Sequence, residues 1–200
     1  MKIRCLHILI FQFLLISYAQ SKVLTDDKNL LEISSRMMER LEKGDVITNS
    51  EVDTNGKQQS LEMKVIALHP RDCHFALPKL ALYENYYQYL DLVQKSIYND
   101  ATQNLFLKVD HSLMPFKMVL SFKLPRINNP GHYQFSFDKG FLKGLIEKIH
   151  IRSHKKRCLM MARADWKGPV SKIPDTIFEM FTTTLSKLTV QRLFIISRTL

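Results

Sequence analysis

Several motifs that would point to a well-known chemistry are missing from this chain of 200 residues. It has three cysteines, with no CxxC pair and no Cys/His cluster at zinc-binding spacing, so a metal site is not indicated. It also lacks a GxSxG motif, an HExxH motif and a glycine-rich phosphate loop. The common hydrolase, metalloprotease and nucleotide-binding classes are therefore not indicated, and we expect no cofactor.

Long hydrophobic runs are also missing, except at the N-terminus. Lys2 and Arg4 precede the mostly apolar segment Leu6–Ile16, and residues 17–19 fit a small-x-small cleavage site. We predict that residues 1–19 form a secretory signal peptide that is cut after its final alanine. A retained membrane anchor is the alternative, although the apolar run is too short to cross a bilayer comfortably.

Positively charged residues outnumber negatively charged ones in this chain. Without the predicted leader it carries 27 Lys plus Arg against 19 Asp plus Glu, a net charge of +8. A basic excess favours anionic partners. Export argues against genomic DNA, so we expect no nucleic acid and consider an anionic membrane or envelope surface. The candidate contact is a basic turn at Arg152, His154, Lys155, Lys156 and Arg157. The alternative is that these charges are solvated and bind no partner.

Two cysteines, Cys73 and Cys158, remain after removal of the leader. An exported pair in an oxidising compartment is a candidate disulfide, and closing such a long loop would stabilise the fold by roughly 4 kcal/mol. Two separately buried thiols are the alternative.

The first third of the mature chain predicts a helix and a β-hairpin. Apolar residues follow helical spacing over Asp26–Leu41, and a glycine comes soon after. Residues 45–53 and 61–69 have strand character, and the Asn-Gly turn at 54–57 joins them. Leu77–Asp100 is rich in tyrosine and spaced like one or two short helices.

A change of period marks the rest of the chain. Alternation of apolar and polar residues predicts an antiparallel meander with strands at 103–109, 116–124, 132–138, 145–152 and 157–166. Residues 175–198 return to helical spacing, and Pro174 suits a first helical turn. A helix of this length would extend roughly 36 Å, enough to cross a curved sheet.

The apolar faces of these strands are predicted to pack against the apolar row of this helix. That row consists of Ile177, Phe181, Leu185 and Leu188. The seam is either a filled core or a plastic apolar pocket. Arg163 would orient an acidic head group there, or would instead face solvent with Asp165. The predicted lining residues are Phe116, Met118, Leu120, Phe122, Tyr133, Phe135, Phe137, Met160, Arg163, Ile177, Phe181 and Leu185.

This order of elements resembles the START-like, or SRPBCC, superfamily over residues 44–200, with residues 20–43 as a helical extension. The segments similar to exported bacterial relatives are residues 131–145 (GHYQFSFDKGFLKGL), 162–169 (ARADWKGP) and 193–198 (LFIISR). The resemblance implies an α+β helix-grip fold, in which a curved antiparallel sheet wraps a long C-terminal helix. In many relatives the space between them holds a sterol, phospholipid, acyl chain or polycyclic aromatic.

Three functions are compatible with these observations. The first is an exported carrier for a hydrophobic small molecule or lipid, periplasmic in a Gram-negative bacterium and otherwise secreted. The second is a cyclase or hydrolase-like enzyme that uses the same cavity, with Tyr133, His132 or Arg163 as its titratable groups. The third is an envelope interaction module whose core is filled.

Overall fold

The computed structural model describes residues 33–112 and 117–199, which belong almost entirely to one structural unit, Arg36–Leu200. The predicted signal peptide, most of the helix predicted at 26–41, and Phe116 lie outside the described residues. The described part of that helix is α2, Ser35–Glu42, and Gly44 follows it with a positive φ of 89°.

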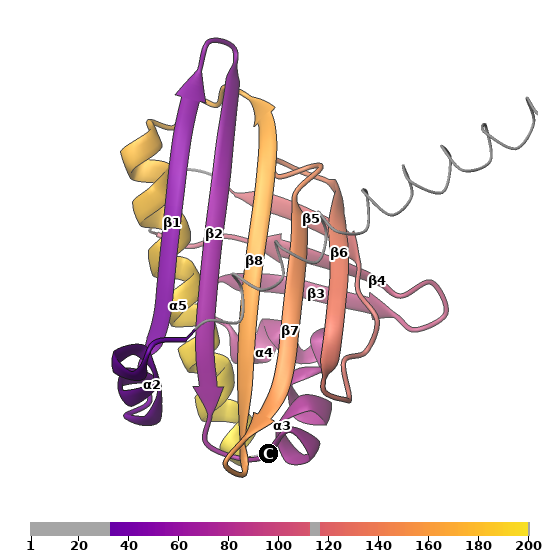
Figure 1. Ribbon diagram of the computed structural model, residues 1–200. Helices are drawn as coiled ribbons and strands as arrows, with labels where there is room; N and C mark the ends of the chain where they lie inside the picture. Colours follow the sequence, from indigo (N-terminus) through magenta and orange to yellow (C-terminus); the bar gives the residue numbers. More distant parts are fainter. Residues whose placement is uncertain (1–32, 113–116, 200) are drawn as a thin grey trace, which may run out of the picture. The chain divides into compact units, whose positions relative to one another are not determined.

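An eight-stranded antiparallel sheet forms the framework (Figure 1). Its order is β1-β2-β8-β7-β6-β5-β4-β3, so that the last strand in the sequence pairs with the second. The strands are β1 (Val46–Asn55), β2 (Gln58–His69), β3 (Val93–Asn99), β4 (Asn104–Val109), β5 (Met118–Lys123), β6 (Gly131–Lys139), β7 (Ile146–His154) and β8 (Arg157–Pro169). The predicted α+β helix-grip architecture is confirmed.

The predicted hairpins are also confirmed. Asn55 pairs with Gln58, and Gly56 takes a φ of 59°, which its missing Cβ allows. In the second hairpin, which contains the basic turn, His154 pairs with Arg157, and both lysines between them have positive φ values.

Short helices connect β2 to β3. They are α3 (Cys73–Leu80), the 3-10 turn η1 (Tyr83–Asn85) and α4 (Tyr86–Tyr89). Asp72 caps α3, because its side chain accepts a hydrogen bond from the backbone N–H of Phe75 at 3.0 Å.

The helical prediction for residues 77–100 was wrong at its end, where Val93–Asn99 forms β3. A register shift between Val93 and Lys95 interrupts the alternation of the strand. As a result Val93 and Ser96 are both buried, three positions apart, and this spacing imitates a helix.

The long helix α5 (Asp175–Thr199) lies along the sheet mainly against β1, then β2, and also contacts α3 (Figure 1). The seam predicted from Ile177 and Leu188 was wrong, because these two side chains are 44% and 45% exposed. Phe181 and Leu185 of the predicted row do pack into or against the core, and the fully buried Phe178 lies beside them in place of Ile177.

The apolar faces that were predicted for the later strands do pack into the core. Phe122 stacks on Phe137 and Phe135, with ring centroids 4.4 and 5.3 Å apart. Trp166 meets Phe178 edge to face at 6.0 Å, which connects β8 to the start of α5.

Cys73 and Cys158 form a disulfide. It joins the first residue of α3 to β8 across 85 residues of sequence, and both cysteines are buried. The bridge therefore fixes the helical connection to the sheet near the turn that joins β7 and β8.

Candidate functional site

A cavity of about 260 Å³ lies between the sheet and the helices of this unit. Its lining comes from β2, β7, β8, α3, the η1–α4 segment, the loop between β5 and β6, and the C-terminal half of α5. The lining residues are Val65, Ala67, Leu77, Leu80, Ala81, Tyr83, Tyr86, Leu124, Ile127, Glu147, Ile149, Ile151, Met160, Met161, Ala162, Val190, Leu193 and Phe194.

Glu147 is the one charged residue among these lining side chains. Its direct neighbours across the sheet are Phe135 on β6 and Ala164 on β8, and Ile149 follows it on the same face of β7. Within the described residues its carboxylate has no hydrogen-bond or ion-pair partner. Glu147 is among the residues that line the cavity, so its carboxyl is the charged group of an otherwise apolar and aromatic lining.

The surroundings of this carboxyl change its protonation. Burial raises the pKa of Glu147 to about 7, from an ordinary value of 4.5. Near neutral pH the group is therefore present in both its neutral and its ionised form.

The other titratable groups of the lining, Tyr83 and Tyr86, have hydroxyls already engaged with the backbone. The Tyr83 hydroxyl donates to the carbonyl of Pro125 at 3.0 Å and accepts from the N–H of Ile127 at 3.2 Å. The Tyr86 hydroxyl donates to the carbonyl of Leu80 at 2.7 Å. Burial raises the pKa of both tyrosines, so they stay neutral.

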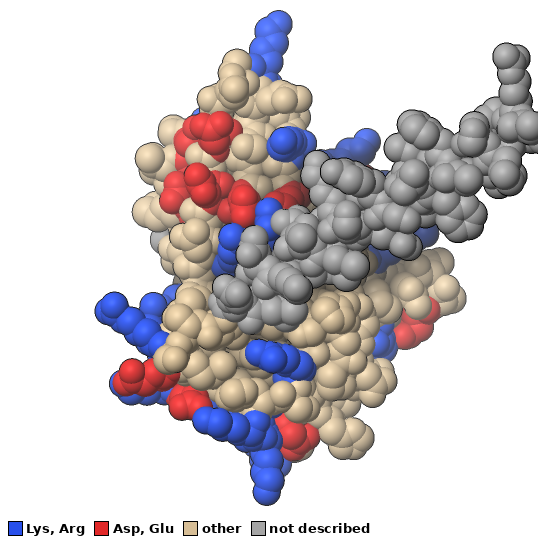
Figure 2. Space-filling view, viewed as in Figure 1, with Lys and Arg blue, Asp and Glu red and all other residues tan. Residues whose placement is uncertain are grey.

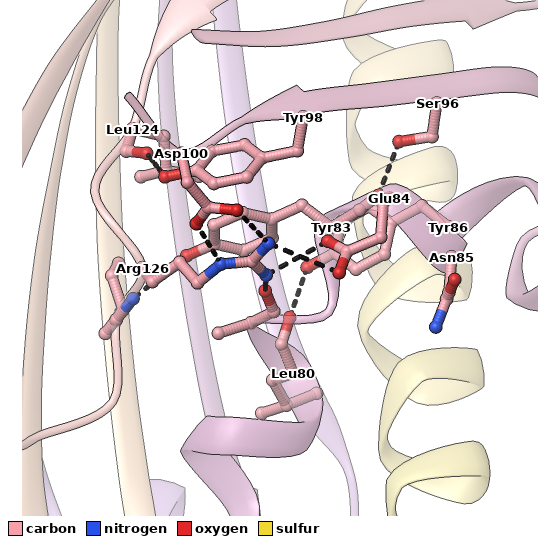
Figure 3. A network of polar contacts seen from close by, with 12 residues as sticks. Leu80, Tyr83, Glu84, Asn85, Tyr86, Ser96, Tyr98, Asp100, Leu124 and Arg126 are labelled. Carbon is pink, nitrogen blue, oxygen red and sulfur yellow. Dashed lines mark hydrogen bonds and ion pairs between the residues drawn. The ribbon is translucent and has the colours of Figure 1, made fainter. Parts of the chain in front are cut away.

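A cluster around Arg126 holds the β5–β6 loop against the helical connection (Figure 3). The Arg126 guanidinium binds Asp100 at 2.6 Å, the carbonyl of Ala81 at 2.7 Å and Glu84 at 3.0 Å. It also lies over the ring of Tyr98, 4.5 Å from the centroid. The hydrogen bond from Arg126 lowers the pKa of the Asp100 carboxyl.

This cluster positions one wall of the cavity. Leu124 and Ile127, on either side of Arg126, both line it. Tyr98 donates to the carbonyl of Leu124 at 2.8 Å, which fixes the start of the loop. The sequence offered no periodic signal for Arg126, because an arginine in a loop between prolines is not distinctive.

Most of the predicted lining residues lie in the core, next to the cavity. Met160 does line it. The others within the core or packed against it are Met118, Phe122, Phe135, Phe137, Phe181, Leu120, Tyr133 and Leu185. A ligand contact for these residues stays a prediction.

Arg163 and Ile177 lie away from the cavity. Strand alternation places Arg163 on the face opposite Ala162 and Ala164, where it contacts Asp165 at 3.2 Å and Glu62 at 3.3 Å. An acidic ligand head group in the cavity therefore does not meet Arg163.

Glu147 was missed in the sequence, although a signal was available. It stands in the alternating row Leu145, Glu147, Ile149 and Ile151, an acid at a position where the strand pattern calls for an apolar residue. A charged residue in a buried row needs a functional or structural explanation.

Some side chains of the basic turn already bind acceptors within the protein. Lys155 pairs with Glu42 at 3.1 Å, and Arg157 donates to the carbonyls of Glu42 and Leu68. Contact between this turn and an anionic surface stays a prediction. In Figure 2 acidic side chains instead gather over the upper part of β1 and β2, where Glu51, Asp53 and Glu62 surround a shallow hollow.

No group of three or more metal-ligating side chains occurs in the part of the chain that the structure describes. Over residues 33–112 and 117–199, no helix has both the length and the apolar character that crossing a membrane requires.

Known proteins resemble this chain in structure but not in sequence. No family model matches it, and no curated protein does. A START superfamily protein from Mycobacterium smegmatis is 13% identical, with a TM-score of 0.52 over 70% of this chain and 99% of that one.

Two further structures match equally well. A STAR-related lipid transfer protein from Xanthomonas axonopodis is 10% identical, with a TM-score of 0.52 over 75% of this chain and 99% of that one. An aromatase/cyclase, Zhui, from a Streptomyces species is 10% identical, with a TM-score of 0.52 over 70% and 94%. At these identities the likeness establishes the fold, and the protein therefore has the START-like, helix-grip fold around an apolar cavity.

Proposed function

We propose that this protein is an exported carrier that binds a hydrophobic small molecule or lipid in the cavity between the sheet and its helices. The observation that carries the proposal is the cavity itself, about 260 Å³ in volume and lined almost wholly by apolar and aromatic side chains. Structures of the same fold include a lipid transfer protein and an aromatase/cyclase, which supports a hydrophobic ligand.

Two features support the export part of the proposal. Residues 1–19 have the composition of a secretory leader, and the Cys73–Cys158 disulfide is of a kind that persists in oxidising compartments. N-terminal sequencing of protein recovered outside the cytoplasm is expected to begin at Gln20. Recovery of the full-length chain from the cytoplasm would contradict export.

The binding proposal is tested with a variant that fills the cavity. Ala162 on β8 lines it between Val65 and Ile149, its direct neighbours in the sheet. We expect Ala162→Phe to abolish the binding of a neutral naphthyl fluorophore that the unchanged protein binds. Ala101→Phe, in the exposed turn between β3 and β4, is the matched control and is expected to bind normally.

Native mass spectrometry of the purified protein gives an independent check. We expect an apolar molecule to co-purify and to be released by organic extraction. A cavity that stays empty and takes up neither lipid nor fluorophore would contradict the carrier function.

The alternatives receive less support from the geometry. Among the residues named for an enzyme, His132 faces away from Tyr133 on β6 and pairs with His150, their Nδ1 atoms 3.0 Å apart. The Tyr133 hydroxyl donates to the carbonyl of Asn129. The interaction module assumed a filled core, whereas a cavity is present.

A further inference from the structure

We infer that the cavity selects ligands whose apolar body carries a hydrogen-bond donor, a protonated amine or a hydroxyl, and that Glu147 accepts the hydrogen bond. This inference rests on the proposed carrier function and adds to it the chemistry of the ligand head group.

The first argument is that Glu147 is the acceptor left open in the lining. Its neighbours Phe135, Ala164 and Ile149 offer it no donor. The hydroxyls of Tyr83 and Tyr86 already donate to backbone carbonyls. Holding a partly buried carboxyl in an apolar cavity without a partner is costly, and a ligand donor that reached it would remove that cost.

The second argument is the sign of the charge. No cationic side chain lines the cavity among the described residues, so an anionic head group would face a carboxylate without compensation. Arg163 is on the other face of the sheet, and Arg126 is bound to Glu84 and Asp100 outside the lining. The elements packed around Glu147 thus disfavour acids and favour donors while the carboxyl is ionised.

Protonation of Glu147 adds a pH dependence. Because burial raises the pKa of this carboxyl to about 7, it is largely ionised at pH 8 and largely neutral at pH 6. The other titratable groups of the lining, Tyr83 and Tyr86, stay neutral over this range. Amine binding is therefore expected to strengthen as the pH rises from 6 to 8.

The test compares octylamine, octanol and octanoate, which share one apolar chain, by isothermal titration calorimetry. At pH 8 we expect octylamine to bind about tenfold or more tightly than octanoate, with octanol between them, since a charge-assisted hydrogen bond in an apolar site is strong. At pH 6 the difference between amine and acid is expected to shrink.

Variants assign the effect to the carboxyl. Glu147→Gln keeps the shape but removes the charge, and it is expected to reduce the preference for the amine over the acid by about tenfold. Glu51→Gln, an exposed carboxyl on β1, is the control and is expected to keep the preference. The pH dependence in the unchanged protein tests the same point without any variant.

The outcomes separate the two proposals. Equal binding of all three ligands at pH 8, or an unchanged ratio of amine to acid affinity in Glu147→Gln, would overturn the head-group inference and leave the carrier function standing. Failure of all three ligands to bind would contradict both.

Discussion

At the scale of single residues, the partly buried Glu147 and the fully buried His69 make folding stability depend on pH in opposite directions. Glu147 has no partner for its charge, and His69 has a hydrogen-bonding pattern that suits the neutral ring. Each predicts its own direction of pH change in which the protein loses stability, and the two ranges overlap between about pH 5 and 6.5.

The free energy of unfolding is expected to fall as the pH rises from about 4.5 to 7, because of Glu147. Its folded pKa is about 7 against an ordinary 4.5, so both states are protonated below this range, and above it the folded state must ionise a carboxyl held in an apolar cavity. The full shift corresponds to about 3 kcal/mol. Glu147→Leu is therefore expected to be more stable than the unchanged protein at pH 8 by up to this amount, measured by urea unfolding.

At pH 4 the gain from Glu147→Leu should be much smaller, and the comparison of the two pH values is its internal control. An equal gain at both would mean that packing, not ionisation, causes the effect.

His69 is expected to destabilise the fold in acid. It is fully buried, accepts from the N–H of Arg71 through Nδ1, and lies 3.0 Å from the Ser197 hydroxyl through Nε2. Burial lowers the pKa of His69 below its ordinary 6.5, so stability is lost as the pH falls through and below that value.

His69→Gln is expected to lose some stability at pH 7, and this loss relative to the unchanged protein is expected to shrink as the pH falls from 6.5 to 5, because the variant lacks the acid destabilisation that His69 causes. Urea titrations at several pH values measure this. A slope unchanged by the substitution would assign it to other groups.

At the scale of elements, two close contacts hold the connections of the meander. One is the corner after β6, where Gly140 has a φ of 97° and where a Cβ would collide with the backbone carbonyl of Val119 on β5. The other is the Arg126 cluster, which fixes the β5–β6 loop.

Gly140→Ala is expected to cost more stability than Gly144→Ala. Both glycines have positive φ, so both substitutions carry about 1 to 2 kcal/mol of backbone strain. A Cβ at Gly144 would meet open space, whereas at Gly140 the strand backbone would have to move. Thermal unfolding of the two variants measures the difference, and equal losses would contradict the close contact.

Arg126→Ala is expected to free the loop that carries Leu124 and Ile127. Loss of the contacts to Asp100, Glu84 and the Ala81 carbonyl leaves acceptors unpaired. Faster amide hydrogen exchange in residues 124–130 and weaker binding of the naphthyl fluorophore are the expected results. Arg40→Ala, at an exposed ion pair with Asp45, is the control.

At the scale of the whole molecule, the disulfide is expected to contribute most to stability among the single links. Replacing Cys73 and Cys158 together by serine opens a loop of 85 residues, for which the chain-entropy relation gives about 4 to 5 kcal/mol. Guanidinium unfolding of the double variant measures this loss. Equal stability of the double variant and the unchanged protein would contradict it.

Much of the architecture could be predicted from local patterns. The Asn-Gly turn, the period of two in the later strands and the helical spacing after Pro174 were each correct because neighbouring residues alone produce them. β3 was missed because its bulge imitates helical spacing. Phe181 and Leu185 were placed correctly in the buried row of α5, whereas Ile177 and Leu188 were not, because apolar residues occupy both sides of that helix.

The sequence by itself determined the elements, their order and the candidate cysteine pair, since hydrophobic period and turn chemistry act over a few residues. The tertiary structure decided where the cavity lies, that Glu147 opens into it, and that Arg126 fixes its wall. These features depend on residues brought together from distant strands and helices, and no local pattern contains that information.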